Sequence, residues 1–188
     1  MKSETRTEES GKQLDLSLLA KGLGVITEAY GASIAEAAAV CLDDQGHEKT
    51  VRLAVSGSVR TAYAVCWNDS TEQARRCWND EPYATEHGAY AVGILIARDI
   101  TGLNVVDRSC KGTGFDFWLG EDSSELPFQN KARLEVSGIR KKNDSAFRAR
   151  SSQKQEQTKA SDSSSLDAYV IVVEFGTPRS HVVKRWMT

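Results

Sequence analysis

The most informative stretch of this chain contains two apolar runs, Gly114-Phe115-Asp116-Phe117-Trp118-Leu119 and Ala132-Arg133-Leu134-Glu135-Val136-Ser137-Gly138-Ile139. Each run is rich in aromatic and branched side chains and predicts a β-strand. Each run also carries one acid near its middle, Asp116 in the first and Glu135 in the second. An acid within an apolar strand is costly to bury unless it meets a cation, a proton or a partner. Two such acids on adjacent strands therefore indicate a site that holds a divalent cation through oxygen ligands.

The size and composition of the chain are those of an ordinary globular protein. It has 188 residues, of which 40% are hydrophobic and 27% are charged, which suits one domain. No apolar run approaches the roughly 20 residues needed to span a bilayer, so we expect no membrane partner. Residues 1–13 are polar, lack the apolar core of a secretory signal and are predicted to be a disordered tail. Residues 14–188 are predicted to form a single α/β domain.

The four cysteines give no sign of a disulfide framework or of a zinc site. No C-x-x-C pair occurs among Cys41, Cys66, Cys77 and Cys110, so a zinc ribbon is not expected. The absence of a disulfide pattern, together with the absence of a secretory signal, favours a cytoplasmic location.

The formal net charge of −2 is unevenly distributed along the chain. From Lys131 to Lys159 there are nine basic and three acidic residues, a balance of +6, so the remainder carries −8. A basic block on an otherwise acidic protein suggests one face for a polyanion, with nucleic acid first and DNA before RNA. The alternative is that the basic block is simply a solvated, charged helix.

The first part of the chain predicts helices and a hairpin. Loose helical spacing predicts a helix over residues 14–30, and Ser33 could cap a second helix over residues 34–44. Residues 51–55 and 62–67 read as paired strands around a Ser-Gly-Ser turn, and a short helix carrying Cys77 follows. We therefore expect residues 14–80 to add helices and a β-hairpin to a core formed by residues 85–188.

The second part alternates helices and strands. It predicts a helix over residues 85–100 that ends at Gly102, and a polar, basic helix over residues 145–160, followed by a serine-rich loop over residues 161–165. The expected strands are residues 104–108, 115–119, 132–139, 168–175 and 181–186. The run Tyr169-Val170-Ile171-Val172-Val173 is nearly continuously apolar, which indicates burial on both faces. This order predicts a three-layer α/β domain with a mixed central sheet flanked by helices.

Residues 85–175, about half of the chain, resemble the core of the PD-(D/E)XK nuclease-like superfamily. That family places an acid on its second core strand and an acid-x-lysine sequence on its third. Here Asp116 matches the first position and Glu135-Val136-Ser137 the second, 19 residues further on. Many relatives carry a glutamate on the first helix, and Glu86 is the matching candidate. The resemblance implies a restriction-endonuclease-like core.

The sequence departs from the family pattern at Ser137, which stands where the family has lysine. In the family that lysine positions the attacking water and stabilises developing charge. A serine hydroxyl can bind water but brings no positive charge. Two explanations remain open: either a lysine from elsewhere reaches the acids, Lys154 being the first candidate and Lys131 the second, or the site is degenerate.

The resemblance implies a metal-dependent nuclease, as found in restriction, anti-phage defence and repair. Asp116, Glu135 and the carbonyl of Val136 would hold Mg²⁺ or Mn²⁺, and Glu86 would complete the ligand set. The expected catalytic residues are Asp116, Glu135, Ser137 and Lys154. The residues expected to contact the nucleic-acid backbone are Arg148, Arg150, Gln153, Lys154 and Gln157.

The acids also have structural interpretations. Asp116 could accept hydrogen bonds from the turn at residues 111–114, Glu135 could pair with Arg133 or Arg108, and Glu86 suits the first turn of a helix. Two other functions stay open. One is a degenerate nuclease-like domain that serves as a binding subunit and contacts a protein through its acidic N-terminal half. The other is an immunity or antitoxin protein.

Overall fold

A computed structural model describes residues 11–121, 130–141 and 144–186, whose strands form a single mixed sheet. The order of strands across the sheet is β1-β3-β2-β8-β7-β6-β5-β4. Most neighbouring strands are antiparallel, and the pairs β1–β3, β2–β8 and β6–β7 are parallel. The strands are β1 (Lys12–Asp15), β2 (Thr50–Gly57), β3 (Thr61–Cys66), β4 (Asn104–Arg108), β5 (Phe117–Gly120), β6 (Asn130–Ile139), β7 (Asp167–Glu174) and β8 (Arg179–Arg185).

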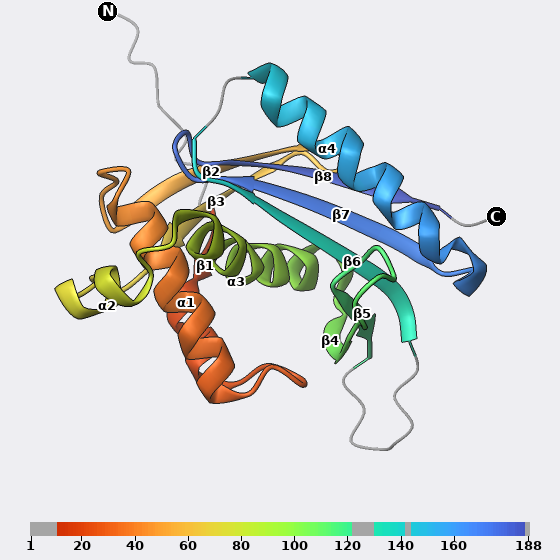
Figure 1. The fold of residues 1–188 in the computed structure, drawn as a ribbon, viewed down its shortest axis with the longest axis horizontal. Helices are drawn as coiled ribbons and strands as arrows, with labels where there is room; N and C mark the ends of the chain where they lie inside the picture. Colours follow the sequence, from red (N-terminus) through yellow and green to blue (C-terminus); the bar gives the residue numbers. More distant parts are fainter. Residues whose placement is uncertain (1–10, 122–129, 142–143, 187–188) are drawn as a thin grey trace, which may run out of the picture.

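Helices lie on both faces of this sheet (Figure 1). One face carries α1 (Glu28–Asp43), α2 (Glu72–Cys77) and α3 (Glu81–Thr101), together with the 3-10 helix η1 (Leu16–Lys21). The other face carries α4 (Asp144–Thr158), which continues into the 3-10 helix η2 (Lys159–Ser164). The predicted three-layer α/β architecture with a mixed central sheet is therefore confirmed.

Strand β7 is buried on both faces, as its apolar run predicts. Val170, Ile171, Val172 and Val173 are all inaccessible to solvent. Ile171 and Val173 belong to the main core beneath α1 and α3, whereas Val170 and Val172 pack with Phe147 of α4. The two helical layers thus meet the same strand from opposite sides.

The prediction of a helix over residues 14–30 is wrong. Leu14 lies in β1, which pairs in parallel with β3, and η1 follows it. Gly22 and Gly24 then adopt positive φ angles of 78° and 58°, which end any helix there. Helix α1 begins after Thr27, whose hydroxyl accepts from the N–H of Tyr30 at 3.2 Å.

Three further boundaries differ from the sequence prediction. Ser33 does not cap a helix, because it lies inside α1. Lys12 and Gln13 belong to β1, so the segment expected to be a tail contributes to the sheet, and its residues 1–10 lie outside the described residues. The serine-rich segment is mostly helical, because η2 extends to Ser164.

The N-terminal hairpin is part of the main sheet rather than a separate addition. Strands β2 and β3 pair as predicted, and β2 also pairs in parallel with β8 over Ala54–Gly57. The strands that precede α3 in the chain and those that follow it therefore belong to one continuous sheet.

Helix α3 crosses very close to β6, which brings its first turns to the two acids. Asp80 caps the helix by accepting from the N–H of Tyr83 at 3.0 Å, and Gly102 ends it in the left-handed conformation. A Cβ atom added at Gly138 would lie 2.3 Å from the backbone oxygen of Thr85. Glycine at this position therefore permits the helix to lie against the strand.

The C-terminal end of α1 is fixed by the buried carboxylate of Asp43. The indole N–H of Trp67 donates to it at 2.7 Å, the N–H and hydroxyl of Ser70 donate at 2.9 and 2.6 Å, and Lys49 forms an ion pair. Burial opposes ionisation, but these donors outweigh it and lower the pKa of Asp43 from 3.8 to about 2.

Replacing Asp43 with asparagine is expected to destabilise the protein in a pH-dependent way. A lowered folded-state pKa stabilises the fold above the unfolded value of 3.8, and this stability is lost as the pH falls towards about 2. The shift corresponds to roughly 2 kcal/mol near neutral pH. Urea denaturation across this range should show the difference between wild type and Asp43→Asn shrinking in acid. Asp69→Asn is the control, because Asp69 is 86% exposed and pairs with the same lysine; an equal loss in both variants would contradict the prediction.

Candidate active site

Asp116 and Glu135 lie on neighbouring chain segments. Asp116 directly precedes β5, one residue before the strand begins, and its N–H donates to the carbonyl of Leu134 on β6 at 2.9 Å. Its carboxylate accepts from the N–H of Val136 at 2.8 Å. This contact, rather than one to the turn at residues 111–114, fixes the orientation of the Asp116 side chain.

Glu135 lies at a place where the sheet is open on one side. Strand β5 pairs with β6 only as far as Leu134, whereas β7 continues beside β6 to Ile139. The N–H of Val136 faces the open side, since it donates to Asp116. The carbonyl of the same residue points to that side too, because the N–H and C=O of a strand residue share a direction. Two carboxyl groups and one carbonyl thus converge at this edge.

Lys154 reaches Glu135 from α4, on the opposite side of the site from α3. Its ammonium group donates to Oε1 of Glu135 at 2.6 Å and to Oε1 of Gln157 at 3.0 Å. The amide of Gln157 donates to the same carboxylate at 3.3 Å. Glu135 therefore pairs with Lys154, and not with Arg133 or Arg108.

The second lysine considered from the sequence lies elsewhere. Lys131 forms an ion pair with Glu121, and Lys154 alone of the two lines the site. Ser137 also lines the site, which therefore combines a serine hydroxyl from β6 with an ammonium group from α4.

Tyr90 is a site residue that the sequence reasoning missed. Its hydroxyl lies 2.8 Å from Oε1 of Glu86 and 3.1 Å from Oδ1 of Asp116. A hydroxyl has one hydrogen, so it can donate fully to only one of the two carboxylates at a time. Glu86 thereby joins the site through Tyr90. The signal available in the sequence is the spacing of four residues between Glu86 and Tyr90, which places both side chains on one face of the helix.

The environment of the two acids disfavours two negative charges. Burial is the largest cause that raises the pKa of Glu135, and the negative charge of Asp116 raises it further, against the opposing effect of Lys154. Burial likewise raises the pKa of Asp116, although the N–H of Val136 and the hydroxyl of Tyr90 oppose it. Such a pair favours a bound cation or a shared proton.

A cavity of about 940 Å³ opens above these groups. Its walls are the first turns of α3, the open edge of β6 and the inner side of α4. Arg150, Gln153 and Gln157 line it, whereas Arg148 is exposed on α4 outside the lining. Of the residues predicted to contact nucleic acid, four therefore share the cavity with the acids.

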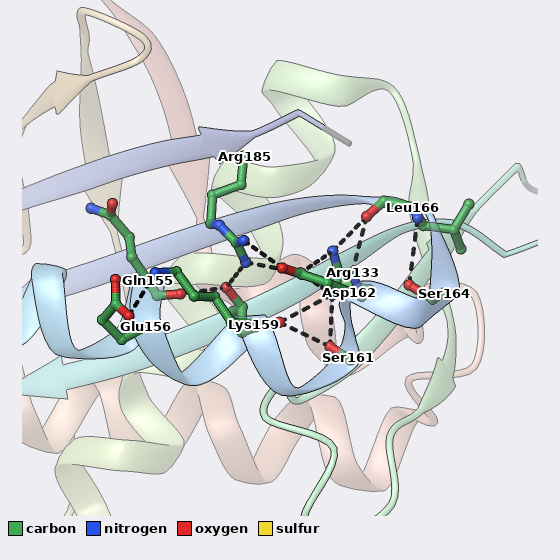
Figure 2. A network of polar contacts seen from close by, with 10 residues as sticks. Arg133, Gln155, Glu156, Lys159, Ser161, Asp162, Ser164, Leu166 and Arg185 are labelled. Carbon is green, nitrogen blue, oxygen red and sulfur yellow. Dashed lines mark hydrogen bonds and ion pairs between the residues drawn. The ribbon is translucent and has the colours of Figure 1, made fainter. Parts of the chain in front are cut away.

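A buried arginine fixes the end of α4 to the sheet (Figure 2). Arg133, which is completely inaccessible to solvent, donates to the carbonyls of Thr158 and Leu166 at 3.1 and 2.6 Å. It also donates to the hydroxyl of Ser161 at 2.7 Å and pairs with Asp162 at 3.2 Å. Arg185 of β8 binds the other oxygen of Asp162 at 2.8 Å. This network positions the helix that carries Lys154.

The donor set is compatible with Mg²⁺ or Mn²⁺. Within residues 11–121, 130–141 and 144–186 no group of three or more His, Cys, Asp or Glu side chains is arranged around a metal position. Mg²⁺ commonly uses one or two carboxylates and fills its other positions with water and substrate phosphate. Oε2 of Glu135 is buried and has no hydrogen-bond partner in the described part of the chain, so it is available as a ligand.

Glu174, a third acid within an apolar strand, has a structural role. Its buried carboxylate accepts from Arg179 at 2.7 Å and from the N–H of Thr177 at 3.1 Å, so it fixes the turn between β7 and β8.

In the described part of the chain, no helix is both long and apolar enough to cross a membrane. Comparison of the chain with protein-family models, with curated proteins and with solved structures finds no match.

Proposed function

We propose that this protein is a metal-dependent nuclease that hydrolyses phosphodiester bonds, with DNA as the expected substrate. The observation that carries the proposal is the ion pair between Lys154 and Glu135, because it places a positive charge beside two buried carboxyl groups in an open cavity. We further propose that α3, β4, β5, β6, α4 and β7 correspond to a PD-(D/E)XK-like core. The antiparallel pairing of β4, β5 and β6, and the parallel pairing of β6 with β7, support this assignment.

Asp116, Glu135 and the carbonyl of Val136 would hold Mg²⁺ or Mn²⁺. When bound, the cation would polarise the phosphoryl group and lower the pKa of a bound water. Tyr90 keeps Asp116 oriented and links it to Glu86. Glu86 is exposed and lines the cavity, where it would bind a metal-coordinated water.

The remaining groups of the cavity suit a phosphodiester substrate. The ammonium group of Lys154 would orient the attacking water and stabilise negative charge that develops on the phosphoryl oxygens. Arg150 at the rim would bind a neighbouring phosphate, which positions the scissile bond. The hydroxyl of Ser137 would offer a further hydrogen bond to water. Substrate positioning is thus divided between β6 and α4.

A degenerate binding subunit is the second candidate function, and the serine at the family's lysine position favours it. Such a subunit would bind nucleic acid or a protein without cleaving a bond. The two candidates differ in one respect that can be measured. Only the nuclease would cleave a phosphodiester bond in the presence of Mg²⁺ or Mn²⁺, and its cleavage would require Glu135.

Replacing Glu135 with alanine is expected to reduce cleavage at least about a hundredfold, since it removes a metal ligand and the partner of Lys154. Nicking of supercoiled plasmid, and cleavage of single-stranded DNA and RNA, should be measured with Mg²⁺, with Mn²⁺ and with EDTA. Glu156→Ala is the matched control, because Glu156 lies on α4 and pairs with Lys159 at the exposed side. Absence of metal-dependent cleavage by the wild-type protein on every substrate would instead favour the binding subunit.

A further inference from the structure

The sheet face that carries α4 is hollowed beyond that helix. Helix α4 packs on β6, β7 and β8, and lies across this face in Figure 1. Over β2 and β3 a separate hollow of about 1430 Å³ is floored by the half-buried side chains of Ala54, Ala62 and Ala64. These residues belong to opposed positions of the hairpin, where Ala54 faces Ala62 and Arg52 faces Ala64. Small side chains leave this part of the sheet accessible.

The hollow is positively charged. Arg52 and Arg60 are exposed at its edges, and no acidic residue lines it within the described part of the chain. Neither arginine forms an ion pair with another described residue, so both guanidinium groups are available to an external anion. Guanidinium groups bind phosphate through paired N–H donors.

Helix α4 stands between this hollow and the cavity of the two acids. On one side its residues Arg150 and Lys154 line the acid cavity. On the other side its Phe147 contacts the ring of His181 at a centroid distance of 6.4 Å, and His181 lines the hollow. The outer surface of α4 is exposed and includes Arg148. The helix thus lies between the acid cavity along one flank and the hollow along the other.

We propose that the hollow over β2 and β3 binds the phosphate backbone of duplex DNA, with α4 lying in the major groove. A helix with its side chains is about 10–12 Å wide, and the major groove of B-DNA is about 12 Å wide. One backbone would then run past the acids and the other past Arg52 and Arg60. The placement of the first backbone rests on the proposed function, whereas the contact of the second is tested by binding alone.

The test measures the affinity of the full chain for duplex DNA in EDTA, so that cleavage does not enter. The double variant Arg52→Gln/Arg60→Gln is expected to bind about tenfold more weakly than wild type. Its plot of log affinity against log salt concentration should be shallower by about 2, since each lost phosphate contact removes about 0.9 from the slope. Arg76→Gln is the control, because Arg76 is 79% exposed on α2, away from the hollow.

A second variant tests the floor without removing an arginine. Ala64→Glu places a negative charge beside Arg52 and is expected to weaken duplex binding by at least the same factor, with an unchanged melting temperature as evidence of folding. Affinity and salt slope equal to those of the Arg76 control would overturn the proposal. Equal binding of single-stranded DNA, with the same dependence on the arginines, would overturn the placement of α4 in a major groove.

The outcomes separate this inference from the proposed function. If duplex binding depends on the two arginines in a protein that cleaves nothing, the proposed DNA binding by the hollow is supported and the proposed nuclease activity is rejected. If cleavage depends on Glu135 and duplex binding is unchanged by replacing both arginines, the proposed nuclease activity is supported and the proposed DNA binding by the hollow is rejected.

Discussion

Replacing Lys154 with alanine is expected to lower metal-dependent cleavage by about 100- to 1000-fold. The variant loses the ammonium group that lies 2.6 Å from Glu135, and with it the positive charge in direct contact with the buried carboxylate. Duplex binding should fall far less, because one phosphate contact contributes only part of the total affinity. The measurement is single-turnover cleavage with saturating protein, which separates the chemical step from binding.

A matched control and a relocated lysine sharpen this test. Lys159→Ala removes a lysine that is 54% exposed and pairs with Glu156, so cleavage should stay close to wild type. Adding Ser137→Lys to Lys154→Ala would place a lysine on β6, at the position that the nuclease-like family uses. We expect this double variant to regain part of the lost rate. Cleavage by Lys154→Ala at the wild-type rate would contradict the assigned role of the ammonium group.

Replacing Arg133 with methionine is expected to lower the free energy of unfolding by about 3–5 kcal/mol, as found when one partner of a buried charged network is removed. The guanidinium group of Arg133 satisfies two carbonyls, one hydroxyl and the carboxylate of Asp162, all near the C-terminal end of α4. Methionine fills a similar volume but donates no hydrogen bond, so the buried carbonyl of Thr158 and the partly buried carbonyl of Leu166 lose this donor. Urea denaturation at neutral pH measures the loss.

Arg185→Met is the comparison for this prediction. Arg185 shares Asp162 with Arg133, but its side chain is 19% exposed and water can replace its hydrogen bonds. We expect a loss of about 1 kcal/mol. Equal losses of unfolding free energy in the two variants would show that burial does not determine the contribution of Arg133 to stability. Because Arg133 holds the end of α4, cleavage by its methionine variant should also fall more than that of Arg185→Met.

The central part of the fold could be predicted from sequence because its signals are local. The continuous apolar run in β7, the alternation around Glu135 and the glycine that ends α3 each depend on residues close together in the chain. The first helix was predicted wrongly because Leu14, Leu18 and Leu19 have helical spacing, yet Leu14 pairs with β3 about 50 residues further on. Parallel pairing over such a distance leaves no local signal.

Within the site, the two acids could be identified from the sequence, because an acid inside an apolar run is visible without a structure. Glu135 lies within its predicted strand, whereas Asp116 lies one residue before β5 begins. The groups that surround the two acids depend on tertiary packing. Lys154 approaches Glu135 because α4 crosses the sheet over β6, and Tyr90 approaches Asp116 because Gly138 lets α3 lie against the same strand. Helix crossing positions result from packing across the whole sheet, which no pattern of neighbouring residues encodes.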